Sequence, residues 1–323
     1  MELVEPVDAV LISGGRSNLT YGLTDSRGTT AVLRRPPRDG ILETAHDMSR
    51  EWRFLTALTD SAVPVAQPLA FAEAGEVLDV PCYAMSYVEG LVLHNAADAG
   101  VLSERARHDV ASNLIDTMVA LHSLDVDAVG LGDIARRGDY IGRQLRRWKR
   151  QWEQSCCADL PIVGEVHDRL ASVIPAQERL TVVHGDFRLG NMISDLAGTI
   201  RAVLDWELAT LGDPLADLGW LLSSWLQAEE TGTLSASDAP PSALPGFRDR
   251  DWMARRYAER SGADISSLKF YIAFSYWRGA CISSGVLTRY EAGVMGDDGF
   301  DSRSLRAVIA SRAESALVLL DAL

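Results

Sequence analysis

The spacing of apolar residues changes between residues 87 and 103 of this chain, and that change limits the folds open to it. As far as residue 87, short apolar runs alternate with Gly, Asp and Pro, a pattern typical of antiparallel strands. The expected strands cover residues 10–12, 19–23, 31–34, 69–72 and 83–87, and one helix is expected over about 44–58. This part of the sequence therefore predicts a small, strand-rich lobe.

From residue 103 onward, helical spacing of apolar residues predominates. Ser103 is expected to cap a helix that reaches Leu124. Asp213 followed by Pro214 has the order of an N-cap and a first helical residue. The other expected helices cover 140–154, 163–173, the segment that ends near 225 and most of the chain beyond 250. These helices predict a second, larger lobe.

Two parts of the second lobe are not expected to be helical. Short strands over 180–183, 192–194 and 200–204 should form a compact β insert, and residues 229–250 should form a loop able to cover a site. The sequence therefore predicts an α+β fold with a small lobe, residues 1–87, and a larger, mainly helical lobe, residues 88–323. The hinge is expected at about 86–90, and a cleft between two such lobes is a natural nucleotide site.

The charge of the chain limits its partners. It carries 31 Lys and Arg against 45 Asp and Glu, a formal net charge of −14 at pH 7. A nucleic-acid groove needs clustered cations, so we expect no nucleic-acid partner. No apolar stretch is long enough to span a bilayer, and the first residues do not resemble a signal peptide, so no membrane partner is expected. Four cysteines without CxxC or metal-ligand spacing favour a cytoplasmic protein, and composition leaves the oligomeric state open.

The clearest chemical signature lies between His184 and Asp205. Asp186 and Asn191 are five positions apart on one expected loop, and Asp205 follows an expected strand. Phosphoryl transfer from ATP needs a carboxylate to take a hydroxyl proton and hard oxygen ligands for Mg²⁺. One such residue alone is usually a turn former. The three together predict a base and two metal ligands.

These motifs resemble those of the aminoglycoside phosphotransferase family, a branch of the protein-kinase-like fold. HGDFRLGN at 184–191 is similar to the catalytic loop of that family, and DWE at 205–207 takes the place of its metal-binding motif. The stretches at 203–221 and 274–290 resemble the subfamily linked to acyl-CoA dehydrogenases. The resemblance implies a two-lobed kinase-like fold and the cofactors ATP and Mg²⁺. It implies that residues 1–87 are the nucleotide-binding lobe and residues 88–323 the catalytic and substrate lobe. It also implies that Asp186 is the catalytic base, that Asn191 and Asp205 bind Mg²⁺, and that His184 orients the loop.

The resemblance also implies which residues contact the nucleotide in the first lobe. The phosphate-covering loop of the family corresponds to Gly14, Gly15, Ser17 and Asn18, although a plain hairpin turn has a similar sequence. The segment at 86–88, formed by Ser86, Tyr87 and Val88, is expected to offer backbone groups to the adenine, although an ordinary linker has the same appearance.

One position departs from the wider family. Where a kinase-like protein has a strand lysine paired with a helical glutamate, this chain has Arg34, with Glu51 as its expected partner. Arg34 is expected to bind Glu51 bidentately and to present N–H groups to the α- and β-phosphates. The alternative is that Arg34 lies on the surface and Arg35 binds the phosphates.

The acceptor is expected to lie near Asp186. The candidate contact residues are Arg188, Asp217, Tyr271, Trp277 and Arg278. Aromatic residues at helical spacing are more often core residues, and Asp217 either braces the catalytic loop or makes a simple cap or buried hydrogen bond. An aminoglycoside is a polycation and needs an acidic pocket, whereas the late helices carry Arg255, Arg256, Arg278 and Arg289. This favours a neutral or anionic acceptor, and the resemblance implies a hydroxyacyl-CoA.

The sequence thus predicts an enzyme that moves the γ-phosphate of ATP to an alcohol group of a small molecule. Two alternatives are an antibiotic kinase of the aminoglycoside type and a nucleotide-binding protein without turnover. A metallohydrolase built from His184, Asp186 and Asp205 is a third interpretation, for which the sequence offers too few further ligands.

Overall fold

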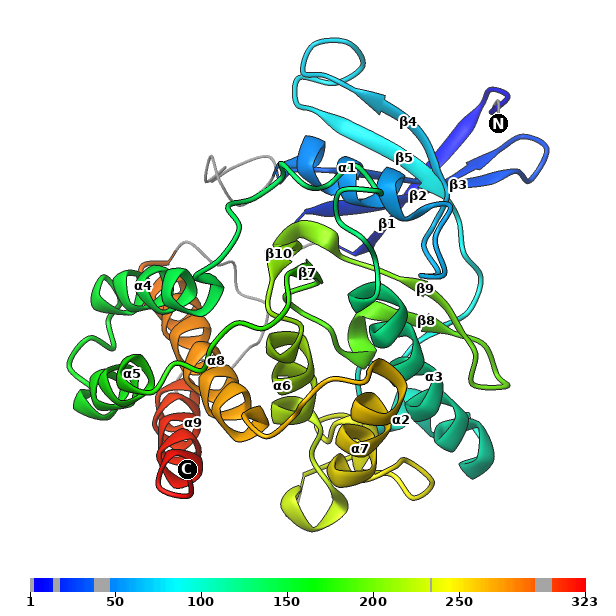
Figure 1. Cartoon of the computed structure of the whole chain (residues 1–323). Helices are drawn as coiled ribbons and strands as arrows, with labels where there is room; N and C mark the ends of the chain where they lie inside the picture. The colour runs from blue at the N-terminus through cyan, green and yellow to red at the C-terminus, as the bar shows by residue number, and fades with distance from the viewer. Residues whose placement is uncertain (1–2, 14–17, 38–46, 233, 294–303) are drawn as a thin grey trace. The chain divides into compact units, whose positions relative to one another are not determined.

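The computed structural model describes residues 3–13, 18–37, 47–232, 234–293 and 304–323 (Figure 1). The chain divides into two compact units. Unit 1 comprises Met1–Ile134, Arg188–Ala209 and Gln227–Asp249, and unit 2 comprises Ala135–Phe187, Thr210–Leu226 and Arg250–Leu323. This division follows compactness, whereas the predicted boundary at 86–90 follows the change from strands to helices and stays a prediction.

The first sheet of unit 1 is antiparallel, with the strand order β1-β2-β3-β5-β4 (Figure 1). Its strands are β1 (Val7–Ser13), β2 (Leu19–Asp25), β3 (Thr30–Arg35), β4 (Pro68–Ala72) and β5 (Cys82–Ser86). The strands predicted in this region are confirmed, and most are longer than expected. In the register of the sheet, Arg34 lies opposite Thr20 on one side and Tyr83 on the other. The sheet thus places these three residues side by side.

Helix α1 (Met48–Leu58) packs against this sheet. It is capped by Asp47, whose side chain accepts the N–H of Arg50 at 3.0 Å. The predicted helix began at 44, and residues 44–46 lie outside the described part of the chain. Its buried face includes Phe54 and Glu51, so the helix directs one carboxylate inward.

The remainder of unit 1 joins two helices to a second sheet. Ser103 caps α3 as predicted, accepting the N–H of Ala106 at 3.1 Å. The elements are β6 (Leu91–Val92), α2 (Ala96–Ala99), α3 (Glu104–His122), β8 (Met192–Ser194) and β9 (Ile200–Val203), with 3₁₀ turns at Leu189–Asn191, Trp206–Leu208, Ala228–Glu230 and Pro241–Ala243. Gly90 has a φ of 153°, and a Cβ there would lie 2.4 Å from a side-chain atom of Ile193. The chain can therefore pass β8 closely only with glycine at this position.

Unit 2 is built around α8. The elements are α4 (Tyr140–Glu153), α5 (Pro161–Ser172), β7 (Thr181–Val183), β10 (Thr210–Gly212), α6 (Leu215–Ser224), α7 (Arg250–Ser261), α8 (Leu268–Glu291) and α9 (Leu305–Leu320). Helix α8 contacts α4, α5, α6 and α9. Gly219 of α6 faces the backbone of Tyr271, because a Cβ there would lie 2.6 Å from it. Close packing of α6 on α8 therefore requires glycine at 219.

The predicted β insert is wrong as a single unit. β8 pairs with β9, but β7 pairs with β10, a strand that the sequence analysis missed. Three residues, Thr210, Leu211 and Gly212, are too few to show the alternation by which a strand is recognised.

The start of α6 also differs from the prediction. Pro214, not Asp213, is the N-cap, and it offers no side-chain hydrogen bond. The carboxylate of Asp213 instead accepts the N–H of Leu215 at 3.0 Å and the hydroxyl of Tyr271 at 2.7 Å. Asp213 therefore ties the beginning of α6 to α8.

Among the helices that the structure describes, none combines the length and apolar character needed to cross a bilayer.

Candidate active site

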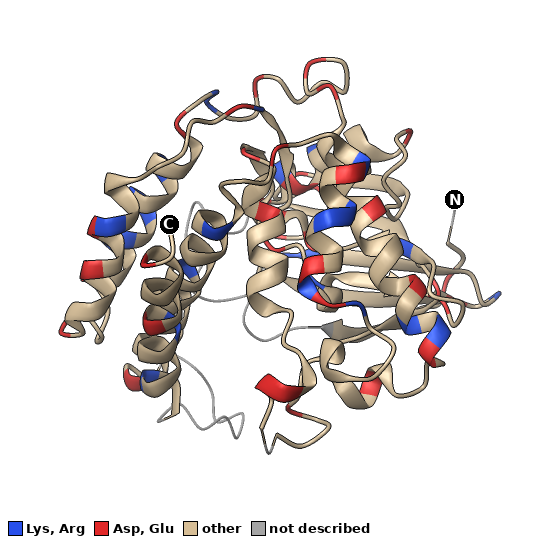
Figure 2. Ribbon diagram, turned by 60° about the horizontal axis from the view of Figure 1, so that its bottom comes forward, with Lys and Arg blue, Asp and Glu red and all other residues tan. Residues whose placement is uncertain are grey.

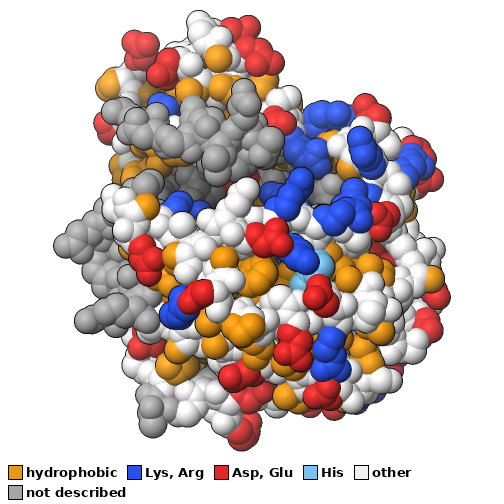
Figure 3. All heavy atoms as spheres, turned by 90° about the vertical axis from the view of Figure 1, so that its left-hand side faces the viewer, with side chains coloured by type: hydrophobic (Ala, Val, Ile, Leu, Met, Phe, Trp, Pro, Cys, Tyr) orange, Lys and Arg blue, Asp and Glu red, His pale blue; other side chains and the backbone are white. Residues whose placement is uncertain are grey.

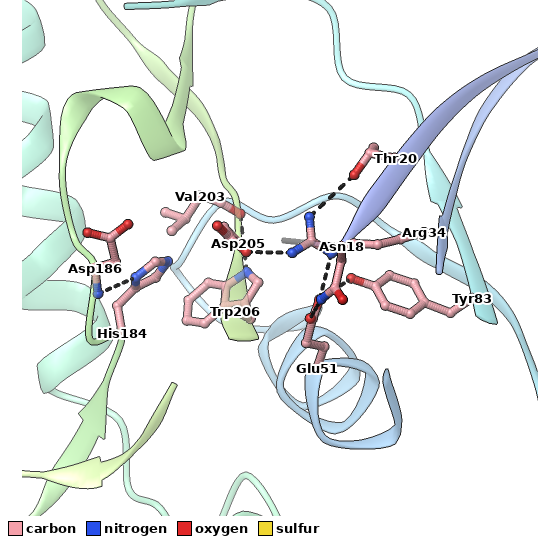
Figure 4. A network of polar contacts seen from close by, with 10 residues as sticks. All are labelled: Asn18, Thr20, Arg34, Glu51, Tyr83, His184, Asp186, Val203, Asp205 and Trp206. Carbon is pink, nitrogen blue, oxygen red and sulfur yellow. Dashed lines mark hydrogen bonds and ion pairs between the residues drawn. The ribbon is translucent and has the colours of Figure 1, made fainter. Parts of the chain in front are cut away.

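The predicted base lies on the loop that follows β7 in unit 2. His184 is fully buried, and its Nδ1 atom accepts the backbone N–H of Asp186 at 3.2 Å (Figure 4). Gly185 between them has a φ of 82°, a conformation that glycine adopts without strain. This geometry fits the predicted role of His184, which is to orient the loop.

Asp217 of α6 braces the same loop. Its buried carboxylate accepts the backbone N–H of His184 at 2.6 Å and that of Gly185 at 2.8 Å. Backbone donors buried away from water cost free energy unless they are paired, so this carboxylate stabilises the loop conformation. Of the alternatives open from the sequence, the structure shows the brace; a contact of Asp217 with an acceptor stays a prediction.

Trp220, one turn further along α6, contacts the predicted base directly. Its indole Nε1–H donates to Oδ1 of Asp186 at 2.7 Å. The guanidinium of Arg278 lies over the ring of Trp220, 4.5 Å from its centroid, and over the ring of Trp148 at 5.3 Å. The sequence analysis missed Trp220, although its spacing of three from Asp217 places both side chains on one helical face.

The two predicted metal ligands come together in unit 1. Asn191 precedes β8 and Asp205 follows β9, and the antiparallel β8–β9 hairpin brings its two ends together. The N–H of Leu204 donates to the backbone oxygen of Asn191 at 2.8 Å. Asp205 has a φ of 65°, which is rare outside glycine, and its side chain is 28% exposed. The hairpin brings the backbones of the two residues together, and a carboxylate and an amide oxygen are of the hard type that Mg²⁺ prefers.

Arg34 of β3 connects Asp205 to Glu51 of α1. Arg34 donates from Nε to Glu51 at 2.8 Å and from a terminal nitrogen to Asp205 at 2.5 Å (Figure 4). Its other terminal nitrogen is 3.4 Å from the hydroxyl of Thr20. The expected bidentate pair is therefore wrong in detail, because the fork of the guanidinium is divided between two carboxylates. Arg35 instead donates to the carbonyl of Pro36, so Arg34 is the residue paired with Glu51.

Glu51 is the buried centre of this network. Its carboxylate, 1% exposed, also accepts from Asn18 Nδ2 and from the hydroxyl of Tyr83. Burial raises the pKa of Glu51, and the positive charge of Arg34 opposes that rise. Burial alone would lower the pKa of Arg34, but Glu51, Tyr83 and Asp205 raise it. Arg34 therefore stays charged and holds its partners in place.

The structure describes only part of the other residues predicted to contact the nucleotide. Gly14, Gly15 and Ser17 lie outside the described residues. In the segment 86–88, Ser86 uses its N–H for the carbonyl of Gln67 at 2.8 Å. Tyr87 is exposed and Val88 half-buried. Their contacts with adenine stay predictions.

Most of the predicted acceptor residues pack in the core of unit 2. Tyr271 and Trp277 are buried, and the indole of Trp277 donates to the carbonyl of Val163 at 2.9 Å. Arg278 is also buried, between two indole rings, whereas Arg188 of unit 1 is exposed. These contacts favour the packing interpretation for Tyr271 and Trp277, and contact with an acceptor stays a prediction for all of them.

The fold and these residues define a class: a small-molecule phosphotransferase with a two-lobed protein-kinase-like fold. Residues 8–258 match the model of the phosphotransferase enzyme family, and the chain belongs to that family. The structure is similar to one from Ralstonia eutropha JMP134, provisionally described as an aminoglycoside phosphotransferase. The two share 30% identity with a TM-score of 0.80, over 97% of this chain and 93% of the other. Aminoglycoside phosphotransferase APH(4)-Ia, solved with AMP-PNP and hygromycin B, shares the fold at 19% identity, with a TM-score of 0.61 over 95% and 94% of the two chains.

The curated relatives are much longer proteins. Acyl-CoA dehydrogenase family member 10 of Mus musculus is 33% identical over 88% of this chain, and member 11 of Gallus gallus is 32% identical over 87%. The matched regions are 27% and 36% of the lengths of those proteins. The chain therefore corresponds to about a third of such a relative.

Among the described residues, no group of three or more His, Cys, Asp and Glu side chains is placed to hold a metal ion. The geometry thus gives no further ligand to the metallohydrolase interpretation. An Asn–Asp pair completed by phosphate oxygens is a different kind of metal site.

Proposed function

We propose that this chain transfers the γ-phosphate of ATP to a hydroxyl group of a small molecule, with Mg²⁺ as cofactor, and that the acceptor is a hydroxyacyl-CoA. The observation that carries the proposal is the position of Asp205. It lies beside Asn191 through the β8–β9 hairpin and is held by Arg34, which in turn is fixed by Glu51. A carboxylate, an amide and a fixed cation are the groups that a triphosphate with its metal requires.

The chain provides a base for the acceptor. The carboxylate of Asp186 takes the proton as the hydroxyl oxygen forms its bond to the γ-phosphorus. The bond from that phosphorus to the bridging β–γ oxygen breaks, and ADP leaves with the electron pair. The indole N–H of Trp220 fixes one oxygen of Asp186, and Asp217 fixes the backbone behind it. A base held in one orientation avoids an entropic cost when the substrates meet.

Other residues serve the nucleotide. Asn191 and Asp205 would hold the Mg²⁺, which when bound neutralises charge on the β- and γ-phosphates. Arg34 orients Asp205 and supplies positive charge near the phosphates. Nucleotide binding is supported by neighbours that share the fold, since one was solved with AMP-PNP and hygromycin B and an amicoumacin kinase with AMP-PNP and Ca²⁺.

Two observations support an acyl-CoA acceptor over an aminoglycoside. The curated relatives are named acyl-CoA dehydrogenase family members, and a hydroxyacyl-CoA is chemically related to the acyl-CoA in that name. The buried guanidinium of Arg278 also lies against Trp220, the residue bonded to the proposed base. A positive charge at that place repels a polycation and attracts an anionic or carbonyl-bearing acceptor.

The proposal is tested by incubating the protein with MgATP and a series of 3- and 4-hydroxyacyl-CoAs, with kanamycin and hygromycin B as competing acceptors. We expect a mass increase of one phosphate on at least one hydroxyacyl-CoA, and formation of that product roughly 10²- to 10⁴-fold more slowly with Asp186→Asn. Phosphorylation of the aminoglycosides alone would establish the antibiotic-kinase alternative. ATP binding without any product would establish a nucleotide-binding protein without turnover.

A further inference from the structure

Helix α4 and the loop before it form the most basic segment of an acidic protein. Residues 136–150 contain seven Lys and Arg and one Asp, in a chain whose formal net charge is −14. Elsewhere along the ribbon, acidic and basic residues are interspersed (Figure 2). Cations gathered in this way repel one another, and an anionic ligand relieves the repulsion.

Six of these seven cations line an open hollow on the surface of unit 2. The hollow has a volume of about 640 Å³ and is lined by Arg136, Arg137, Gly138, Asp139, Arg143, Arg146, Lys149 and Arg150. Figure 3 faces the side of Figure 1 on which α4 lies and shows Lys and Arg side chains gathered there. A hollow of this volume is within the range of small-molecule sites. We call it the α4 hollow.

Only some of these cations have acidic partners. Arg146 pairs with Asp139 at 2.6 Å, and Lys149 lies 3.6 Å from Asp168. Arg136 and Arg150 pair with no carboxylate among the described residues. The hollow therefore keeps positive charge that the protein itself does not neutralise.

A continuous set of contacts in unit 2 leads from α4 to the proposed base. Trp148 of α4 packs against Arg278, Arg278 packs against Trp220, and Trp220 donates to Asp186. Arg278 is 5% exposed, and its Nε has no hydrogen-bond partner among the described residues. A buried guanidinium nitrogen without a partner costs free energy that a ligand oxygen would recover. Burial, and then the positive charge of Arg278, lower the pKa of the neighbouring Arg147, as expected where cations crowd without an anion.

We propose that the α4 hollow binds the phosphate groups of the acceptor, namely those of the nucleotide part of coenzyme A. This inference rests on the proposed function, because it gives the acceptor a second point of attachment remote from the reacting hydroxyl. Guanidinium groups bind phosphates through paired N–H donors, and several arginines around one hollow suit a ligand with several phosphates. The flexible pantetheine arm connects these phosphates to the acyl chain, whose hydroxyl reacts at Asp186.

The test removes charge from the hollow without touching the proposed catalytic residues. The variant is Arg136→Gln with Arg150→Gln. The matched control is Arg105→Gln with Arg201→Gln, two exposed arginines of unit 1 that remove the same charge. With a hydroxyacyl-CoA, we expect KM to rise at least roughly 10-fold in the variant, because each arginine loses a charged hydrogen bond to a phosphate, with kcat unchanged. With the matching hydroxyacyl-pantetheine, which lacks the nucleotide, variant and wild type should have the same KM.

Direct binding separates this inference from the proposed function. Calorimetry should show that coenzyme A and adenosine 3′,5′-bisphosphate bind the wild type and the control, and bind the variant at least roughly 10-fold more weakly. Inorganic phosphate or single-stranded DNA binding as tightly as coenzyme A would overturn the assignment. If coenzyme A binding depends on the two arginines but no hydroxyacyl-CoA is phosphorylated, the subsite stands and the proposed function fails. If phosphorylation occurs and the variant behaves as the control, the subsite fails and the proposed function stands.

Discussion

Replacing Trp220 by Phe removes one hydrogen bond and little else. The indole Nε1–H of Trp220 is 2.7 Å from the carboxylate of Asp186, while its ring packs against the guanidinium of Arg278. Phe keeps an aromatic surface for Arg278 and has no N–H. Trp220 is only half-buried, so the smaller ring should leave the fold intact.

The size of the effect follows from that one bond. A hydrogen bond to a charged group contributes about 1.5–3 kcal/mol. If the bond holds Asp186 in the orientation that receives the proton, its loss raises the barrier by a similar amount. Because about 1.4 kcal/mol corresponds to a tenfold change in rate, kcat should fall roughly 10- to 150-fold.

The assay is steady-state turnover of ATP with the phosphorylated acceptor as product, together with thermal unfolding of each variant. We expect the KM for ATP and the unfolding midpoint of Trp220→Phe to match the wild type, because the bond orients the base and does not bind the nucleotide. Trp220→His, which can still donate an N–H, should recover part of the lost kcat. A Trp220→Phe enzyme with kcat within about twofold of the wild type would refute the reasoning, since the bond would then contribute almost nothing.

Three further predictions concern stability. Arg34→Met leaves Glu51 buried without its cation, so the free energy of unfolding measured in urea should fall by about 3–5 kcal/mol. Arg105→Met, at an exposed pair, is the control and should lose less than about 1 kcal/mol. Equal losses in the two variants would contradict the importance of the buried pair. Asp217→Asn leaves one acceptor oxygen for two buried N–H groups and should cost about 1–3 kcal/mol in the same assay, and an unchanged urea midpoint would argue against the brace. Burial alone would raise the pKa of Asp25, but three backbone N–H groups lower it to about 2 from 3.8. The stabilisation by the ionised Asp25 should be complete above about pH 4 and disappear as the pH falls toward 2. In Asp25→Asn, the free energy of unfolding should therefore depend less steeply on pH between about 2 and 4. A pH dependence as steep as that of the wild type would rule out this role of Asp25.

The elements of the fold that the sequence predicts well are those encoded by neighbouring residues. Ser103 and the apolar spacing that follows it encode α3 within one segment, and the structure shows the predicted cap. The pairing of Arg34 with Glu51 is also predicted, because the resemblance to kinase-like proteins implies a strand cation opposite a helical carboxylate, and the structure shows the bond.

The contacts that the sequence did not reveal join distant segments. Arg34 and Asp205 are 171 positions apart, and no local pattern predicts that one guanidinium divides its fork between two carboxylates. Trp220 and Asp186 meet because α6 packs beside the loop after β7, and neither residue shows this in its own neighbourhood. The pairing of β7 with β10 is similar, since register between short strands depends on what surrounds them.

The central claim is that Asp186 receives the proton of a hydroxyl while Asn191 and Asp205 bind the metal of the nucleotide. The most direct measurement is the single-turnover rate of γ-phosphate transfer by Asp186→Asn at saturating MgATP, with the Kd for ATP determined on the same sample. We expect the rate to fall roughly 10²- to 10⁴-fold, the usual contribution of a positioned base, with the Kd unchanged. Transfer at the rate of the wild type would contradict the account.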